Sequence, residues 1–338
     1  MNFDDITLIP SPFCEIESRK DVNPSQKLAS SFLGVPIISS PMTSVYSPEL
    51  AKAAAQAGAI SVVHRFASIE ENISLFREGI LNEDGETIKP WVSVGTSDAE
   101  LERAEALVSV GADTLVLDVA NAASTQAVRQ VRRLRELFKL PIIAGNFSTK
   151  EQIEAFNERI GKPVEGYRVG VGTGSACATQ DTVTGIGLKH VNTILSCVAS
   201  GMPIIMDGGL KKPADMCKAL ALGCTAVMMG RPFAACVESG ATTVERVNSM
   251  VEVKPDLPRV PEFKKFKVYR GSASASSYEE QGKTASHRAP EGREELIEIT
   301  GPVQGMLQYY EAALRSSMTY LNARDLTEYR NNATWTRV

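Results

Sequence analysis

Short apolar runs alternate with longer amphipathic segments along the first two-thirds of the chain. The runs are rich in β-branched residues, and the segments that follow them carry apolar residues at helical spacing. Apolar strands that alternate with amphipathic helices are typical of a parallel sheet covered by helices. The predicted strands span residues 35–40, 59–64, 91–94, 114–119, 141–144, 167–171, 203–206 and 226–229.

The segments between the runs carry helix signals. Ser47 can cap a helix, and Pro48 fits the first turn of that helix. Residues 124–138 and 215–222 have the apolar spacing of amphipathic helices. Eight strand–helix units predict an α/β fold, a closed (β/α)8 TIM barrel, with an open doubly wound sheet as the alternative.

The active site of such a barrel lies at the carboxyl ends of its strands. The residues that directly follow the predicted strands are therefore the first candidates for a functional site. They are residues 40–43, 64–65, 118–121, 145–146, 172–179, 207–209 and 230–231.

The segment after the sixth strand is rich in glycine. Gly170, Gly172 and Gly174 alternate with other residues, and Cys177 and Thr179 follow them. Glycines at this density let a backbone bend tightly and approach a ligand closely, so Cys177 could meet a substrate. These residues alone leave an alternative open, a tight turn with a small buried thiol.

The loops after the seventh and eighth strands favour a phosphate group. Gly208 and Gly209 follow Asp207, and Arg231 follows Gly230. Barrel enzymes often bind phosphate with these two loops, where backbone N–H groups face the anion. An arginine there can add a bidentate contact. The residues together indicate a phosphate-bearing substrate beside a cysteine nucleophile.

Composition excludes several classes of function. The net charge is -4 and no long basic run occurs, which argues against a nucleic-acid binder. No apolar stretch approaches the roughly 20 residues of a membrane-spanning helix, and the acidic start is unlike a signal peptide. The six cysteines and three histidines form no zinc-binding spacing. We expect a cytoplasmic protein with reduced thiols.

Two segments lie outside the eight units. Residues 252–293 are long and polar, which favours a lid over the site, with disorder as the alternative. The last segment returns to helical periodicity around residues 306–314 and should pack on the barrel. We expect one barrel domain over residues 1–338, with a flap at about 252–293 and a C-terminal segment at 294–338.

Several motifs together resemble the superfamily of inosine-5′-monophosphate (IMP) dehydrogenase and guanosine-5′-monophosphate (GMP) reductase. The motifs lie at residues 40–42, 172–179, 207–209, 269–271, 290–292 and 315–319. The resemblance implies a TIM barrel that binds a purine nucleotide with its C2 atom beside Cys177. It also implies a nicotinamide cofactor on the other side of the purine ring, and a homotetramer.

Within the superfamily, the chain is more similar to the reductases. Residues 118–121, 18–22 and 184–187 resemble reductase segments, as does Arg288 before Glu291. Only residues 77–89 separate the second helix from the third strand, which leaves no room for the regulatory CBS insertion of the dehydrogenases. The dehydrogenases hydrolyse their intermediate with an Arg-Tyr pair on the flap, whereas residues 275–286 contain Tyr278 with no arginine before it.

The resemblance implies an NADPH-dependent reductive deamination of GMP to IMP and ammonia through a covalent Cys177 thioimidate. It gives each candidate residue a role. The catalytic residues are Cys177, Thr179 and Glu291. The substrate-binding residues are Ser40, Asp207, Gly208, Gly209, Gly230, Arg231, Gly271, Ser272, Arg288 and Gly292. The cofactor-binding residues are Ser18, Arg19, Arg65, Asp118, Val119, Ala120, His287, Ser316 and Thr319. Carbonyls of Gly172, Gly174 and Cys177 could hold a potassium ion.

Departures from the reductase pattern keep alternatives open. Arg65 stands where a lysine is usual, His287 replaces a tyrosine, Arg231 a small residue and Ser272 a methionine, while Pro290 is dehydrogenase-like. The alternatives are IMP oxidation by a dehydrogenase, a deoxy or modified purine monophosphate as substrate, and a barrel without turnover. Thr179 could also cap a turn, Glu291 could be a solvated lid residue, and Asp207 could simply form a turn.

Overall fold

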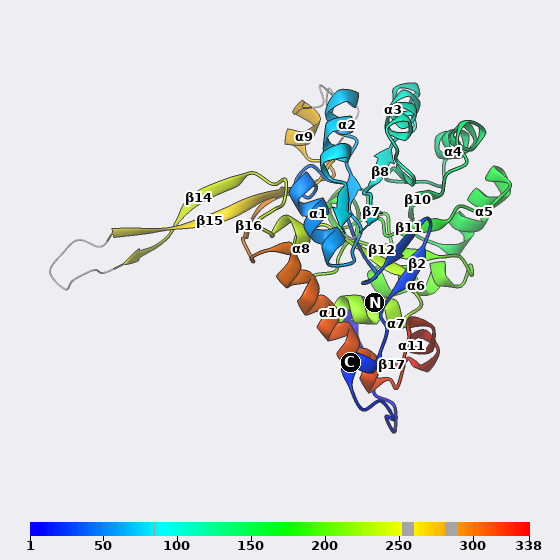
Figure 1. Ribbon diagram of the computed structural model, residues 1–338, viewed down its shortest axis with the longest axis vertical. Helices are drawn as coiled ribbons and strands as arrows, with labels where there is room; N and C mark the ends of the chain where they lie inside the picture. The colour runs from blue at the N-terminus through cyan, green and yellow to red at the C-terminus, as the bar shows by residue number, and fades with distance from the viewer. Residues whose placement is uncertain (84, 252–259, 281–288) are drawn as a thin grey trace.

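The computed structural model describes residues 1–83, 85–251, 260–280 and 289–338, and its centre is a parallel barrel (Figure 1). The eight predicted strands are confirmed, with small shifts at their ends. They are β4 (Ile37–Ser39), β5 (Val62–Val63), β8 (Trp91–Val94), β9 (Leu115–Asp118), β10 (Ile142–Phe147), β11 (Gly166–Val169), β12 (Ile204–Asp207) and β13 (Ala226–Met229).

The barrel closes between β4 and the residues before β5. The sheet order is β4-β13-β12-β11-β10-β9-β8-β5, and a parallel bridge joins Ile38 to Ile60. The Ser39 amide donates to the Ile60 carbonyl at 2.8 Å. An open doubly wound sheet would leave these edges unpaired, so the closed (β/α)8 barrel is the correct alternative.

A helix follows each barrel strand. The helices are α1 (Pro48–Gln56), α2 (Ile69–Glu78), α3 (Asp98–Ser109), α4 (Thr125–Leu137), α5 (Lys150–Ile160), α6 (His190–Val198), α7 (Pro213–Ala221) and α8 (Arg231–Ala234). The predicted cap of α1 is confirmed, because the Leu50 amide donates to Ser47 Oγ at 3.0 Å. This bond satisfies one of the amides that a helix start leaves without a partner.

The amino-terminal end of the barrel is plugged. A small hairpin of β2 (Gln26–Leu28) and β3 (Ser31–Leu33) contributes Leu28 and Leu33 to the apolar cluster inside the barrel. Trp91 lies in the same cluster and donates from Nε1 to Ser31 Oγ at 2.9 Å. Because these side chains close the amino-terminal end of the barrel, a ligand can enter only at the carboxyl ends of the strands.

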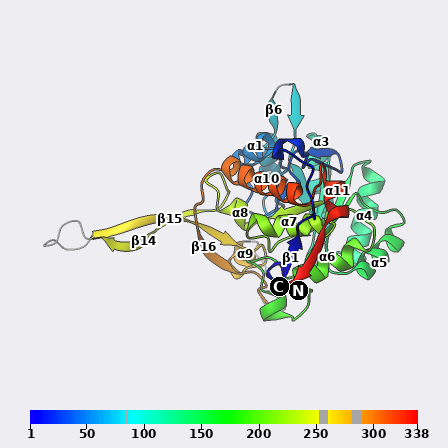
Figure 2. The ribbon, with the colours of Figure 1, turned by 90° about the horizontal axis from the view of Figure 1, so that it is seen from below.

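The segment beyond α8 forms strands and a short helix. Its described residues form the antiparallel strands β14 (Thr243–Val251) and β15 (Val260–Arg270), and a short helix α9 (Ala275–Glu280). This two-stranded arm projects far from the barrel in both views (Figures 1 and 2). It joins β16 (Glu294–Glu298) in a three-stranded sheet. Within the expected flap at 252–293, the described residues thus include a strand and a helix, and a lid over the site stays a prediction.

The chain ends lie side by side (Figure 2), and the first residues contact α6 and α7. The strand β1 (Ile6–Ile9) pairs with β17 (Thr334–Arg337), and α11 (Leu326–Asn332) precedes β17. The long helix α10 (Val303–Tyr320) packs against α7 and α1. A hairpin of β6 (Leu81–Glu83) and β7 (Glu86–Ile88) fills the connection between α2 and β8. Among the described helices, none has the length and apolarity needed to cross a membrane.

Candidate active site

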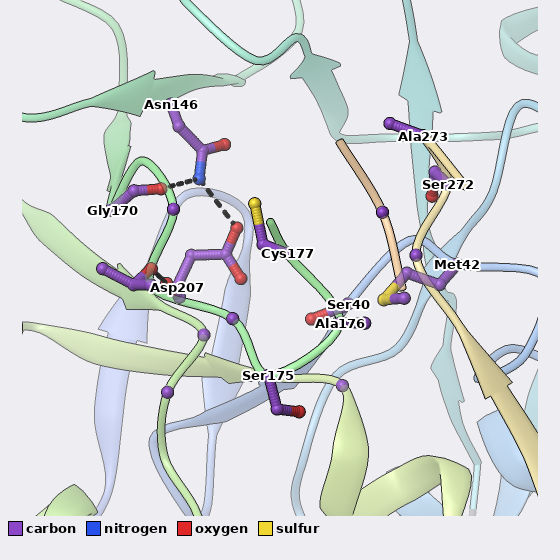
Figure 3. A pocket seen from close by; sticks show the side chains of 18 of the residues that line it. Ser40, Met42, Asn146, Gly170, Ser175, Ala176, Cys177, Asp207, Ser272 and Ala273 are labelled. Carbon is purple, nitrogen blue, oxygen red and sulfur yellow. Dashed lines mark hydrogen bonds between the residues drawn. The ribbon is translucent and has the colours of Figure 1, made fainter. Parts of the chain in front are cut away.

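The carboxyl ends of the barrel strands surround a cavity of about 600 Å³. Figure 3 shows Cys177 and Asp207 among the residues in this cavity. The structure brings most of the predicted site residues to its walls. These are Ser40, Arg65, Asp118, Val119, Ala120, Gly172, Gly174, Cys177, Thr179, Asp207, Gly208, Gly209, Gly230, Arg231, Gly271, Ser272, Glu291 and Gly292.

Cys177, Thr179 and Glu291 form a chain of hydrogen bonds. The Cys177 thiol donates to Thr179 Oγ1 at 3.1 Å, and Thr179 Oγ1 donates to Glu291 Oε2 at 2.6 Å. A thiol proton can pass along such a chain to the carboxylate. The Thr179 hydroxyl therefore connects the thiol to the carboxylate. A residue that only capped a turn would need neither of these two hydrogen bonds.

Backbone pairing places Glu291 beside the cysteine loop. The Ala178 amide donates to the Glu291 carbonyl at 2.6 Å, and Cys177 forms an antiparallel bridge with Gly292. A side chain at Gly292 would meet the backbone of Ser274, since a Cβ there would lie 2.5 Å from the Ser274 nitrogen. Three chain segments thus pack backbone against backbone, which makes glycine necessary at position 292.

Asp207 ends β12 and faces the cavity with one oxygen engaged. Its Oδ2 accepts from Asn146 Nδ2 at 3.0 Å, and the same amide nitrogen donates to the Gly170 carbonyl at 2.7 Å (Figure 3). Asn146 therefore links the ends of three strands, β10, β11 and β12. From the sequence, Asn146 was expected at a strand end but had no predicted role.

Arg168 is a buried arginine that sequence analysis missed. It lies on β11, with a side chain only 5% exposed. Its Nη1 contacts Asp118 Oδ1 at 2.8 Å, and its Nη2 contacts Asp207 Oδ2 at 2.8 Å. Burial alone would lower the pKa of Arg168, but the carboxylates of Asp207 and Asp118 outweigh burial and raise it. The guanidinium is therefore a permanent cation between two carboxylates.

Arg65 follows β5 and lies between Asp118, which it shares with Arg168, and one further carboxylate, that of Glu100. Its Nε is 3.6 Å from Asp118 Oδ2, and its Nη1 is 3.9 Å from Glu100 Oε1. Its guanidinium also stacks 4.6 Å from the centre of the Phe66 ring. Arg65 lines the cavity, and its charge is balanced by these acidic neighbours.

The predicted phosphate loops lie together at another part of the cavity wall. Gly208 and Gly209 adopt positive φ angles of 80° and 74°. A Cβ on Gly209 would lie 1.8 Å from His190 Nε2, so only glycine fits there. Arg231 Nε lies 3.2 Å from Glu295 Oε1 on β16, a partner that the sequence did not reveal.

Several cysteines and one histidine of the barrel are buried. Burial raises the pKa values of Cys197, Cys217 and Cys236 to about 12. Burial and the charge of Arg103 lower the pKa of His64 to about 4. His64 is thus a neutral core histidine. In the part of the chain that the structure describes, no group of three His, Cys, Asp or Glu side chains could hold a metal ion.

The sequence profile of the IMP dehydrogenase / GMP reductase domain matches residues 1–338. The chain belongs to this family. It is an oxidoreductase, and the family implies a nicotinamide cofactor. The family match confirms the resemblance that the motifs indicated, and the closed barrel confirms the predicted fold.

Curated relatives of the IMP dehydrogenase / GMP reductase family carry the name GMP reductase. The protein from Klebsiella pneumoniae is 32% identical over 352 residues, covering 100% of this chain and 94% of the relative. The protein from Vibrio vulnificus is 30% identical with the same coverage. The crystal structure of GMP reductase from Trypanosoma brucei in complex with guanosine 5′-monophosphate shares the fold. Its TM-score is 0.84 at 23% identity, with 100% of this chain and 95% of that chain covered.

Some residues that were predicted to bind the cofactor lie away from the cavity that contains Cys177. Ser18 caps the short 3-10 helix η2 (Arg19–Asp21), which packs against α10. Arg315 Nη1 donates to the Arg19 carbonyl at 3.3 Å. Ser18, Arg19, Ser316 and Thr319 do not line the cavity formed by the described residues. His287 and Arg288 lie outside the described residues.

Proposed function

We propose that this chain catalyses NADPH-dependent reductive deamination of GMP to IMP and ammonia. The observation that carries the proposal is the hydrogen-bond chain from the Cys177 thiol through Thr179 to Glu291. A carboxylate connected to a nucleophilic thiol can remove the thiol proton and return it to a leaving group. The curated relatives named GMP reductase support the choice of substrate.

The proposed covalent step exchanges the amino group at C2 of the purine for the sulfur of Cys177 and needs no further reactant. The sulfur of Cys177 forms a bond to C2 of the purine, and the exocyclic C2–N bond breaks. The thiol proton moves through Thr179 to Glu291 and then leaves on ammonia. The product of this step is a thioimidate that joins the purine to Cys177. The nicotinamide group, when bound, would supply the hydride that converts C2 to its IMP state, and the C2–S bond then breaks to leave Cys177 as a thiolate, which takes a proton from solvent.

The walls of the cavity fit the rest of the nucleotide. The Oδ1 of Asp207 is available to ribose hydroxyls, since Asn146 and Arg168 hold Oδ2. The Gly208 amide donates to the Met228 carbonyl at 3.1 Å, so the Gly209 amide, at the cavity wall, is the one proposed to donate to a phosphate. Arg231 adds a positive charge beside these loops.

The residues near β9 fit a nicotinamide cofactor. Asp118, Val119 and Ala120 line the same cavity as Cys177, so a ring bound there shares a space with the nucleotide. Arg65 Nε is buried without a hydrogen-bond partner among the described residues. Asp118 and Glu100 balance the charge of Arg65 only through long contacts of 3.6 and 3.9 Å, and Arg65 is the cation proposed to face the phosphate of NADPH.

A potassium ion at Gly172, Gly174 and Cys177 belongs to the same proposal. Carbonyl oxygens are suitable ligands for hard cations of this type. The Gly174 carbonyl accepts from the Cys177 amide at 3.0 Å and keeps a second lone pair. Turnover in potassium should then exceed turnover in a buffer of large organic cations.

Reduced-nicotinamide absorbance tests the proposed reaction directly. Purified protein is offered GMP with NADPH or NADH, and separately IMP or 2′-deoxy-GMP with the matching cofactor. Oxidation of NADPH with GMP supports the proposal. Formation of NADH from IMP and NAD⁺ would instead show a dehydrogenase, and faster turnover of 2′-deoxy-GMP would correct the substrate.

A further inference from the structure

One arginine connects two strands that carry different parts of the proposed site. Arg168 on β11 contacts Asp118 at the end of β9 and Asp207 at the end of β12, each at 2.8 Å. Under the proposed function, Asp207 faces the ribose and Asp118 faces the cofactor. Arg168 thus lies between the nucleotide side and the cofactor side.

The guanidinium holds both carboxylates in a fixed relationship. Its planar fork gives each carboxylate a separate nitrogen, Nη1 for Asp118 and Nη2 for Asp207. The Arg168 side chain is almost fully buried, and a buried charge that loses its partner is strongly unfavourable. Movement of either carboxylate therefore changes the position or the hydrogen bonding of the other.

Each carboxylate also has a second partner that Arg168 does not share. Asn146 Nδ2 donates to Asp207 Oδ2 at 3.0 Å, and Arg65 Nε lies 3.6 Å from Asp118 Oδ2. Neither of these partners has a described contact with both carboxylates. Arg168 provides the direct connection between them.

We propose that Arg168 is a positioning residue that couples nucleotide binding at Asp207 to the state of Asp118 on the cofactor side. This inference rests on the proposed function. It assigns Arg168 no contact with substrate: the arginine acts by holding the two carboxylates. A change at Asp118 should therefore reach the nucleotide through Arg168, before any cofactor is present.

A double-mutant cycle on GMP binding tests the coupling. GMP affinity is measured by calorimetry without cofactor for the wild type, Asp118→Asn, Arg168→Gln and the double variant. We expect Asp118→Asn to weaken GMP binding about threefold to tenfold in the wild type and to have no effect in the Arg168→Gln background. Where Arg168→Gln does not fold, Arg168→Lys takes its place, because a single ammonium keeps the charge without the two-pronged fork.

Glu100→Gln is the matched control. It also removes one negative charge beside Arg65, but Glu100 contacts Arg65 and Arg103, not Arg168. GMP affinity should stay within about twofold of the wild type in this variant, which separates the coupling from general electrostatics.

The outcomes distinguish this inference from the proposed function. A loss of GMP affinity in Asp118→Asn that disappears without Arg168 supports the coupling. GMP binding that Asp118→Asn leaves unchanged, or weakens equally in both Arg168 backgrounds, overturns the coupling alone. A wild-type protein that binds no GMP overturns the proposed function and, with it, the inference.

Discussion

Thr179 Oγ1 donates a 2.6 Å hydrogen bond to Glu291 Oε2, although 112 residues separate the two along the chain. The contact is possible because residues 291–293 pair with the cysteine loop through their backbone, as in the bond from the Arg293 amide to the Ala176 carbonyl. The backbone therefore fixes the position of the carboxylate, and the carboxylate can act on the thiol through Thr179.

Replacing Glu291 by Gln should remove the proton acceptor and leave the fold unchanged, since the backbone bonds at position 291 remain. We expect kcat with GMP and NADPH to fall about 100-fold or more, with GMP affinity little changed. Glu298→Gln is the control, because Glu298 lies on the nearby strand β16 and pairs with Lys264 on the surface. Equal rates for the two variants would show that Glu291 has no part in proton transfer.

Arg231→Ser should weaken the binding of the phosphate group. The Arg231 side chain is 39% exposed, so solvent screens its charge, and we expect a rise of about fivefold in the KM for GMP. The difference from the wild type should shrink at high salt. Guanosine, which has no phosphate, should bind both proteins equally. Arg246→Ser on the exposed strand β14 is the control, and an equal effect there would rule out a specific role for Arg231.

Gly209→Ala and Gly161→Ala separate backbone strain from steric overlap. Both glycines have a positive φ, 74° and 83°, but a Cβ on Gly161 meets open space. Gly161→Ala should lower the free energy of unfolding by about 1 kcal/mol. Gly209→Ala should cost about 2 kcal/mol more, since its Cβ overlaps His190. Chemical denaturation measures the free energy of unfolding of both variants. Equal losses would show that the His190 side chain moves aside at no cost.

His64 should make the protein less stable in acid. Its pKa is lowered from 6.5 to about 4 by burial and by Arg103. Between these two pH values the unfolded chain binds a proton that the folded chain does not, so the free energy of unfolding falls as the pH falls. The loss should reach about 3 kcal/mol. His64→Gln should flatten this slope, and an unchanged slope would mean that His64 titrates normally.

The barrel could be predicted from the sequence because its strands are buried on both faces. Residues 226–229, for example, are apolar throughout, and β13 has these same bounds. The strand ends then indicated where Cys177, Asp207 and Gly230 would meet. The arm of β14 and β15 was not predicted, because its apolar side chains Val247 and Phe263 are exposed. Burial on β15 is found at Lys267 and Tyr269, near the end of the strand, which is too short a stretch to give a clear alternating pattern.

Arg168 could have been found from the sequence. It stands between Tyr167 and Val169 in a strand predicted to be buried, and a charge in such a place needs an acidic partner. The identity of its two partners depends on the order of strands around the barrel, as does the pairing of Arg231 with Glu295. The pattern of apolar and polar residues along one sequence does not show which strands are neighbours in the barrel.

The most direct test of the proposed chemistry is the ammonia released from GMP in the presence of NADPH, measured for the wild type and for Cys177→Ala. The wild type should release one ammonia for each NADPH oxidised. Cys177→Ala should bind GMP with similar affinity and lose about a thousandfold or more of the rate. Ammonia release by Cys177→Ala at the wild-type rate would contradict a covalent role for Cys177.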